Sequence, residues 1–372
     1  MFGKRGSLAR KPILVRTSLN SRNVGSLLCA SVPPAQRVVN FFFRTQLVVA
    51  RDSNSRPLAA LHGLPPQWPE GKEFAFTVFD DTDDATLENV RPVYDFLHDC
   101  GFRTTKSVWP FEPVGTPHGT GSSCEDAEYL AWLRQLQAAG FEIGYHGASR
   151  GDNDRDTTRR SLERFGERFG RGPVVFTNHA GNAEAIYWGD ARLTGMARAA
   201  YLVLTGFRSL RCFRGHVPGS RYFWGDLCRE AVTYVRNFVY ADINTLRACP
   251  YMPYTDDARP FVKAWFASSE GGDMDCFCRL LSEENQDRLV RERGACIVYT
   301  HFARGFVENG VVRADFRAHM EQLARRNGWF VPVGTLLSWL ESQRGGVHEL
   351  TPGERRCLEW RWLRDKLFLG RT

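Results

Sequence analysis

Side chains that can bind a metal or move a proton follow several apolar runs of this sequence. Asp80 and Asp81 come directly after an apolar run at 74–79, and His146 follows a second one at 141–145. Four more residues stand at equivalent places further along the chain: Asn178, His179, Asp242 and His301. If the runs are parallel strands, their carboxyl ends meet at one face, where barrel enzymes place their chemistry. The pattern therefore predicts a site built from carboxylates and imidazoles.

Paired carboxylates together with histidines suit the hydrolysis of an amide or an ester. A bound divalent metal lowers the pKa of its water and polarises the carbonyl group. A carboxylate beside that water can accept its proton, and a histidine can give a proton to the leaving group.

Asp83 and Asp84 follow Asp80 and Asp81 in the same acidic run. We expect these two to serve the start of the helix near Leu87, because carboxylates are favourable at helix N-termini.

Strands must alternate with helices to bring these residues together. The spacing of apolar residues predicts helices at 87–100, 125–139, 157–169, 283–293 and 315–327. Short apolar runs between the helices predict parallel strands, in roughly seven βα units. We therefore predict an α/β protein with a distorted (β/α)7 TIM-like barrel in a single domain.

Three of the strand ends carry motifs that resemble the NodB-homology polysaccharide deacetylases, carbohydrate esterase family four. The motifs are Phe76–Asp81, Gly140–His146 and Ile297–His301, and their order resembles that of the family across residues 74–302. The resemblance implies a (β/α)7 barrel that uses a divalent metal, often zinc, to remove acetyl groups from sugars. We therefore expect a metal-dependent deacetylase that acts on an N-acetylated sugar or glycoconjugate.

The resemblance also implies roles for individual residues. Asp80 would be the catalytic base and His301 the catalytic acid. Asp81 and His146 would be metal ligands.

The second motif departs from the family pattern at its second metal-binding position. Members usually carry another histidine four residues after the first, and this sequence has Arg150 there. A guanidinium group offers only donors, so it cannot bind a cation. We expect His179 to be the third ligand instead, with Asp152, Asn153 or Asp154 as alternatives. If no metal binds, Arg150 is expected to form an ion pair with Asp81.

Substrate contacts are expected from the other strand ends. Trp109 follows a predicted strand, and an indole ring suits stacking on a sugar face. Asn178 and Asp242 occupy the third and fourth motif positions, where the usual residues of the family are altered. We expect these three side chains to bind a carbohydrate or glycolipid.

Two other functions are compatible with the same residues. The missing second histidine is compatible with a deacetylase fold that has lost catalysis and only binds carbohydrate. A glycoside hydrolase would use two carboxylates about 5–10 Å apart across a cleft, for which Asp80 with Asp242 or Glu270 are candidates.

Charge and hydropathy restrict the partners. The chain has 372 residues and a formal net charge of +7, but residues 1–50 hold eight Lys and Arg and no acidic residue. Taking those eight from the total of 49 leaves 41 basic against 42 acidic residues in the remainder. This balance gives no sign of a nucleic-acid groove, and no apolar run is long enough to span a membrane. Without a clear signal peptide, a cytoplasmic location is expected.

The same distribution suggests three regions. Residues 1–67 are expected to form a basic, disordered extension, residues 68–345 the deacetylase-like barrel, and residues 346–372 a C-terminal helix packed on it.

Overall fold

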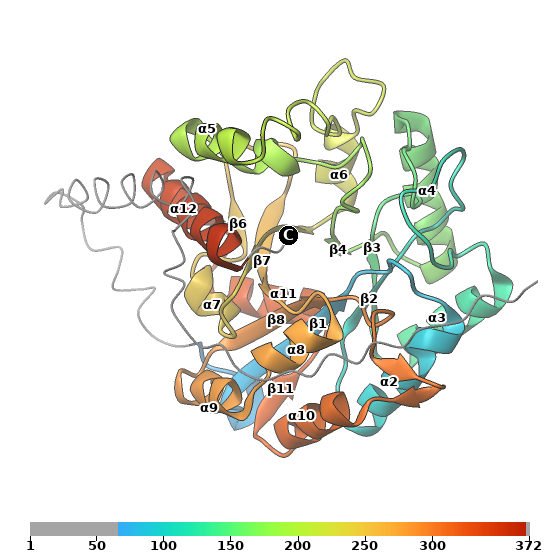
Figure 1. The fold of residues 1–372 in the computed structure, drawn as a ribbon, viewed down its shortest axis with the longest axis vertical. Coiled ribbons are helices and arrows are strands. Elements are labelled where there is room, and N and C mark those ends of the chain that lie inside the picture. The colour runs from blue at the N-terminus through green and yellow to red at the C-terminus, as the bar shows by residue number, and fades with distance from the viewer. Residues whose placement is uncertain (1–65, 370–372) are drawn as a thin grey trace, which may run out of the picture. The chain divides into compact units, whose positions relative to one another are not determined.

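The computed structural model describes residues 66–369, and most of the predicted N-terminal extension lies outside this range. Seven parallel strands form a ring in the order β1, β2, β3, β4, β5, β7 and β8, and β8 pairs again with β1 (Figure 1). Their bounds are β1 Phe74–Asp80, β2 Thr105–Val108, β3 Glu142–Tyr145, β4 Val175–Phe176, β5 Tyr234–Tyr240, β7 Ala264–Glu270 and β8 Ala295–Thr300. The predicted (β/α)7 barrel is confirmed.

Helices surround the ring (Figure 1). Those between or after the barrel strands are α2 Leu87–Asp99, α3 Ala127–Ala138, α4 Arg155–Phe169, α6 Gly225–Ala231, α8 Met274–Leu280, α9 Glu283–Arg291, α10 Ala314–Ala324 and α11 Val333–Arg344. Helix α2 buries Val90, Val93, Tyr94 and Leu97, the kind of apolar spacing that predicted it. Nearly all residues of the barrel strands are buried, because both faces of a parallel barrel are covered.

The barrel is distorted between β7 and β8. These strands pair only through Ser269 with Val298 and Glu270 with Tyr299. Toward the amino end of β8, the short helix α7, Thr245–Ala248, and its N-cap residue Asn244 lie against the strand. The Asn244 side chain accepts from the Ala295 amide at 3.3 Å, and Thr245 Oγ1 accepts from the Ile297 amide at 2.9 Å. Side chains thus satisfy strand amides that would otherwise pair with β7.

Shorter elements complete the fold. The strands among them are β6 Tyr254–Thr255, β11 Gly328–Phe330 and β12 His348–Glu349 on the main sheet, and the hairpin β9 Val307–Glu308 with β10 Val311–Val312. The helices are η2 Pro69–Gly71, η3 Gly189–Arg192, α5 Gly195–Leu204 and α12 Pro352–Leu369. No helix within residues 66–369 has the length and apolar character of a membrane span.

Candidate functional site

Three histidines from three different loops converge on one carboxylate, Asp83. His146 follows β3, His179 follows β4 and His301 follows β8. Asp83 Oδ1 lies 3.3 Å from His146 Nε2 and 3.4 Å from His179 Nε2, and Asp83 Oδ2 lies 3.1 Å from His301 Nε2. The three imidazoles are at most 5% exposed and the carboxylate is 16% exposed. We call these four residues the histidine cluster.

A hydrogen-bond chain fixes the tautomer of His146. The Thr177 hydroxyl donates to Asp81 Oδ1 at 3.0 Å, so its oxygen is left to accept. His146 Nδ1 lies 2.8 Å from that oxygen and therefore carries the hydrogen. In the neutral imidazole, Nε2 then presents a lone pair to Asp83.

His179 is fixed in the same way. Its Nδ1 lies 2.8 Å from Asn182 Oδ1. The Asn182 amide nitrogen donates to Ser149 O and to Glu184 Oε1, which sets the orientation of the amide. His179 Nδ1 is therefore the donor, and its Nε2 also points a lone pair at Asp83.

The surroundings move the pKa values of two histidines in opposite directions. Burial dominates at His179 and lowers its pKa. Burial also opposes the charged form of His301, but its hydrogen bond to Asp83 outweighs that effect and raises its pKa. Burial by itself would raise the pKa of Asp83, yet the nearby His146 and His301 hold it well below the usual range. The cluster thus favours a neutral His179 and a protonated His301.

Asp81 lies beside this cluster on a different partner. Arg236 of β5 donates to both of its oxygens, at 3.1 and 2.6 Å. Burial opposes ionisation of Asp81, but the Arg236 charge and the nearby His146 lower its pKa overall. The sequence-based assignment placed Asp81 with His146 and His179, and the structure has Asp83 in that place.

Asp80 is enclosed by structural partners. Its Oδ2 lies 3.0 Å from Lys106 Nζ and accepts from the Tyr94 hydroxyl at 3.1 Å, while its Oδ1 accepts from the Phe302 amide at 2.8 Å. Asp80 and Lys106 are both fully buried. These contacts do not leave the proposed catalytic base facing the histidine cluster.

The expectation for the helix near Leu87 also needs correction. Asn89, and not an aspartate, accepts from the Thr86 amide at the start of α2. Asp84 contacts Thr120 and Arg304.

The alternative third ligands have other partners. Asp154 is the N-cap residue of α4. Asp152 contacts His118 at 2.9 Å, and the Asn153 side chain donates to Glu184 at 2.7 Å. None of these contacts leads to the histidine cluster directly.

Arg150 does not occupy the place of a metal. Its Nη2 lies 2.6 Å from Glu112, and its Nη1 donates to the Gly121 carbonyl at 2.9 Å. The ion pair with Asp81 that a metal-free site was expected to show is therefore made by Arg236 and not by Arg150.

The expected substrate-binding residues are engaged within the protein. Trp109 is fully buried, with its ring 5.9 Å from that of His146 and 5.4 Å from that of His179. The Asn178 side chain donates to the Ile186 carbonyl and accepts from the Ile186 amide. Asp242 pairs with Arg247 and Arg288. The buried indole packs on the histidine rings and has no free face for a sugar. Asp80 and Asp242 are each paired with basic side chains, which does not favour a glycosidase that uses these two carboxylates.

Two residues that the sequence reasoning missed stand at the centre of the site, Asp83 and Arg236. Arg236 had a usable signal, because a charged residue inside a buried apolar strand is rarely found without a partner. Asp83 had a weaker one, since it shares an acidic run with three other aspartates.

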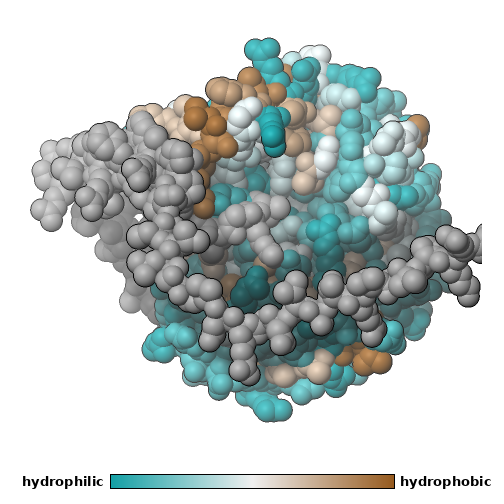
Figure 2. Space-filling view, in the orientation of Figure 1, coloured by the Kyte–Doolittle hydropathy of each residue, from teal (hydrophilic) through white to brown (hydrophobic). Residues whose placement is uncertain are grey.

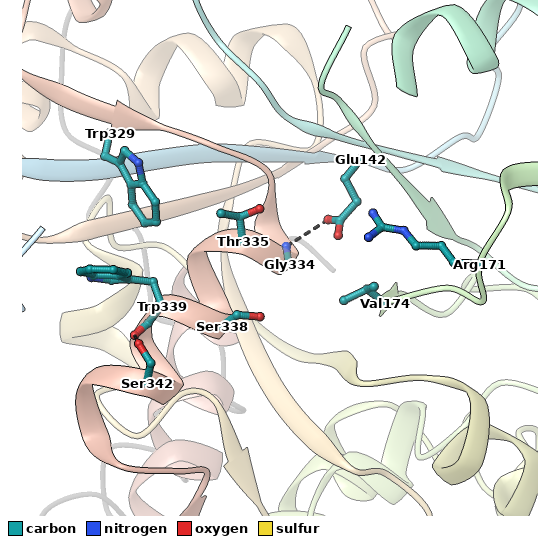
Figure 3. Close-up of a pocket in the computed structure, with 9 residues that line it drawn as sticks. All are labelled: Glu142, Arg171, Val174, Trp329, Gly334, Thr335, Ser338, Trp339 and Ser342. Carbon is teal, nitrogen blue, oxygen red and sulfur yellow. Dashed lines mark hydrogen bonds between the residues drawn. The ribbon is translucent and has the colours of Figure 1, made fainter. Parts of the chain in front are cut away.

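The structure has one small cavity beside the histidine cluster and a larger one at the other end of the barrel. A space of about 10 Å³, room for one water molecule, is lined by residues that include His146, His179, Asn182 and Glu184. A larger cavity of about 460 Å³ is lined by Glu142, Arg171, Trp329 and Trp339 among others (Figure 3). Glu142 is the first residue of β3, so the larger cavity lies at the amino ends of the strands, opposite the histidine cluster.

As the side chains stand, no group of three or more His, Cys, Asp or Glu residues within 66–369 forms a metal site. The donor set of the cluster is nevertheless that of a zinc site, because imidazole nitrogens and carboxylate oxygens are common zinc ligands. Zinc bonds near 2.0–2.1 Å place tetrahedral ligands roughly 3.3–3.4 Å apart. The separations from Asp83 Oδ1 to the two Nε2 atoms have these values.

Comparisons with known proteins give matches among solved structures only. No family model and no curated protein matches the chain. A putative polysaccharide deacetylase from Mycobacterium smegmatis is 14% identical, with a TM-score of 0.45 and 77% of this chain and 97% of that chain covered. A probable polysaccharide deacetylase from Pseudomonas aeruginosa PAO1 is 13% identical, with a TM-score of 0.43 and coverage of 78% and 98%. The motifs of the chain resemble those of the polysaccharide deacetylases.

Proposed function

We propose that this protein is a hydrolase that removes an acetyl group from an N-acetylated sugar or glycoconjugate. A divalent cation, zinc by the donor set, would be held by Asp83, His146 and His179. The motif resemblance supports the reaction class. The observation that carries the proposal is the convergence of two histidine Nε2 atoms on one oxygen of Asp83.

Three lone pairs converge between Asp83, His146 and His179 when both imidazoles are neutral. Both Nδ1 atoms carry the hydrogen, so neutral His146 and His179 present only acceptors to Asp83. A proton on His179 would satisfy the carboxylate, but burial lowers the pKa of this imidazole. A divalent cation would satisfy the three atoms at once, and it would polarise the acetyl carbonyl and acidify a water molecule.

The other residues would move and hold protons. His301, whose pKa is raised, would give the proton on Nε2 to the leaving nitrogen. We assign the base to Asp81 rather than Asp80, because Asp80 is enclosed by Lys106. Arg236 would keep Asp81 ionised and aimed at the barrel interior.

The test is metal binding followed by acetate release. We expect the full chain to bind about one equivalent of Zn²⁺ by calorimetry and to release acetate from N-acetylated oligosaccharides. Asp83→Asn should lose most of both, since an amide oxygen is a weaker ligand than a carboxylate. Asp99→Asn is the control, because this carboxylate is 83% exposed at the end of α2, outside the histidine cluster, and the substitution should change neither.

Two outcomes would contradict the proposal. Zinc binding that is equal in Asp83→Asn and wild type would place the metal elsewhere. Oligosaccharide binding without zinc binding or acetate release would instead support a carbohydrate-binding protein that has lost catalysis.

A further inference from the structure

An apolar and basic surface lies on α5 and the turns that follow it. The molecule exposes seven large apolar side chains within the described residues, and five of them fall between positions 196 and 217: Met196 at 55%, Val203 at 68%, Phe207 at 57%, Leu210 at 42% and Val217 at 40%. Figure 2 shows apolar side chains gathered at the edge where Figure 1 places α5. Monomeric soluble proteins rarely expose such a concentration without a partner. We call residues 195–217 the apolar–basic segment.

The charges of this segment have one sign. Between Asp190 and Asp226 the sequence holds six arginines and no acidic residue. Arg208, Arg211 and Arg214 are exposed, and none of the three pairs with a carboxylate among residues 66–369. The exposed apolar side chains are therefore interleaved with unpaired positive charges.

The segment is held firmly enough to act as a platform. Ala197 of α5 is buried, and the Tyr201 ring lies 5.7 Å from the ring of Trp362 on α12. Successive turns follow, in which the Phe207 amide donates to Leu202 O at 2.8 Å and the Leu210 amide donates to Phe207 O at 3.1 Å. Phe207 and Arg211 hold left-handed φ angles of 60° and 61°. Bulky residues seldom adopt this conformation, so the turns fix the direction of both side chains.

We propose that the apolar–basic segment docks the protein on the surface of an anionic lipid bilayer. Apolar side chains flanked by arginines match the interfacial region, where apolar groups reach the acyl chains and cations meet the phosphates. A second copy is disfavoured as the occupant, because a two-fold interface would bring the arginines of one segment against those of the other. The proposal is independent of the proposed deacetylase function, although His179 and this segment belong to the same connection after β4.

The test is sedimentation of the full chain with vesicles. One set contains phosphatidylcholine alone and the other contains phosphatidylglycerol at about 30%. We expect binding to the anionic set only, and weaker binding as salt rises, because the Debye length shortens to about 3 Å at 1 M. Phe207→Asp with Leu210→Asp should reduce the partition coefficient at least about tenfold. Each of Arg208→Ala, Arg211→Ala and Arg214→Ala should reduce it about fivefold.

A matched control separates the segment from general exposure. Val311 is 66% exposed on β10, outside the segment, so Val311→Asp should bind like wild type. Thermal unfolding with a midpoint like that of the wild type would show that the variants remain folded.

Several results would overturn the proposal. Equal vesicle binding by wild type and Phe207→Asp with Leu210→Asp would assign binding to another region, such as the basic residues 1–50. No binding to either vesicle set would exclude a bilayer as the occupant. A wild-type dimer in light scattering that the same double substitution converts to a monomer, without vesicle binding, would make the segment a self-association surface.

Discussion

Neighbouring aspartates in this site differ because successive side chains of a strand point to opposite faces. Asp80, the last residue of β1, is paired in register with Lys106 and contacts Tyr94 of α2, in the helix layer. Asp81 turns inward and meets Arg236 of β5. The sequence places both carboxylates at one strand end, but only one of them can face the barrel interior.

This alternation predicts a stability role for Asp80. Asp80→Asn should leave Lys106 buried without an anionic partner and lower the free energy of unfolding by about 3–5 kcal/mol in urea titrations. The folded fraction should keep its zinc affinity, because Asp80 does not contact the histidine cluster. A variant of unchanged stability that has lost acetate release would restore Asp80 as the catalytic base.

His301 is expected to set the alkaline side of the pH profile. As an acid it must be protonated, so activity is present below its pKa and is lost as pH rises through it. His301→Gln should lower kcat about 10²–10⁴-fold and remove this limb from the profile. An unchanged limb in the variant would exclude His301 as the acid.

At the scale of elements, the connection after β4 is organised by a buried carboxyl group. Glu184 accepts from the side chains of Asn153 and Asn182 and from the Asn153 amide. Asn182 in turn holds His179. Burial raises the pKa of Glu184 to about 7 in spite of these donors. A single acidic residue therefore links the loop after β3 to the loop that carries His179.

The raised pKa of Glu184 predicts a loss of stability with rising pH. The folded carboxyl keeps its proton from about pH 4.5 to about pH 7, whereas the unfolded one has released it, so the folded state binds more protons in this window. Stability should fall across the window by about 3 kcal/mol. Glu184→Gln cannot titrate, so its unfolding free energy should lack this component. Parallel urea-stability curves for the two proteins would contradict the assignment.

The elements were more predictable from the sequence than the contacts between them. Helix α2 was expected at 87–100 and spans Leu87–Asp99, because its apolar spacing is set locally. The partners of Asp80 and Asp83 depend on which face each side chain takes after β1 and on loops far away in the chain. Glu184 gives no local signal at all, since its burial depends on Asn153 and Trp224 from other elements.

At the scale of the whole molecule, the C-terminal helix is joined to the barrel by both apolar and charged contacts. Leu358, Trp362 and Leu363 of α12 are buried. Glu359 is also buried and pairs with Arg259 at 2.8 Å, while the Thr194 hydroxyl donates to it. These contacts reach α5 and the strand region around β5 and β6, so α12 closes one side of the fold.

We therefore expect α12 to unfold together with the barrel. Trp362 is 1% exposed, and its ring lies 5.7 Å from Tyr201 and 5.8 Å from Phe238 of β5. Trp362→Ala should cost about 3–5 kcal/mol, because the cavity lies between α12, α5 and the barrel wall. Arg364→Ala on the exposed side of the same helix should change stability by less than about 0.5 kcal/mol. Urea unfolding followed by both fluorescence and circular dichroism should give one shared transition whose midpoint falls in the tryptophan variant. A separate early transition that accounts for all of the destabilisation by Trp362→Ala would show that α12 unfolds independently. In that case α5 would lose its contact with α12 while the barrel stayed folded.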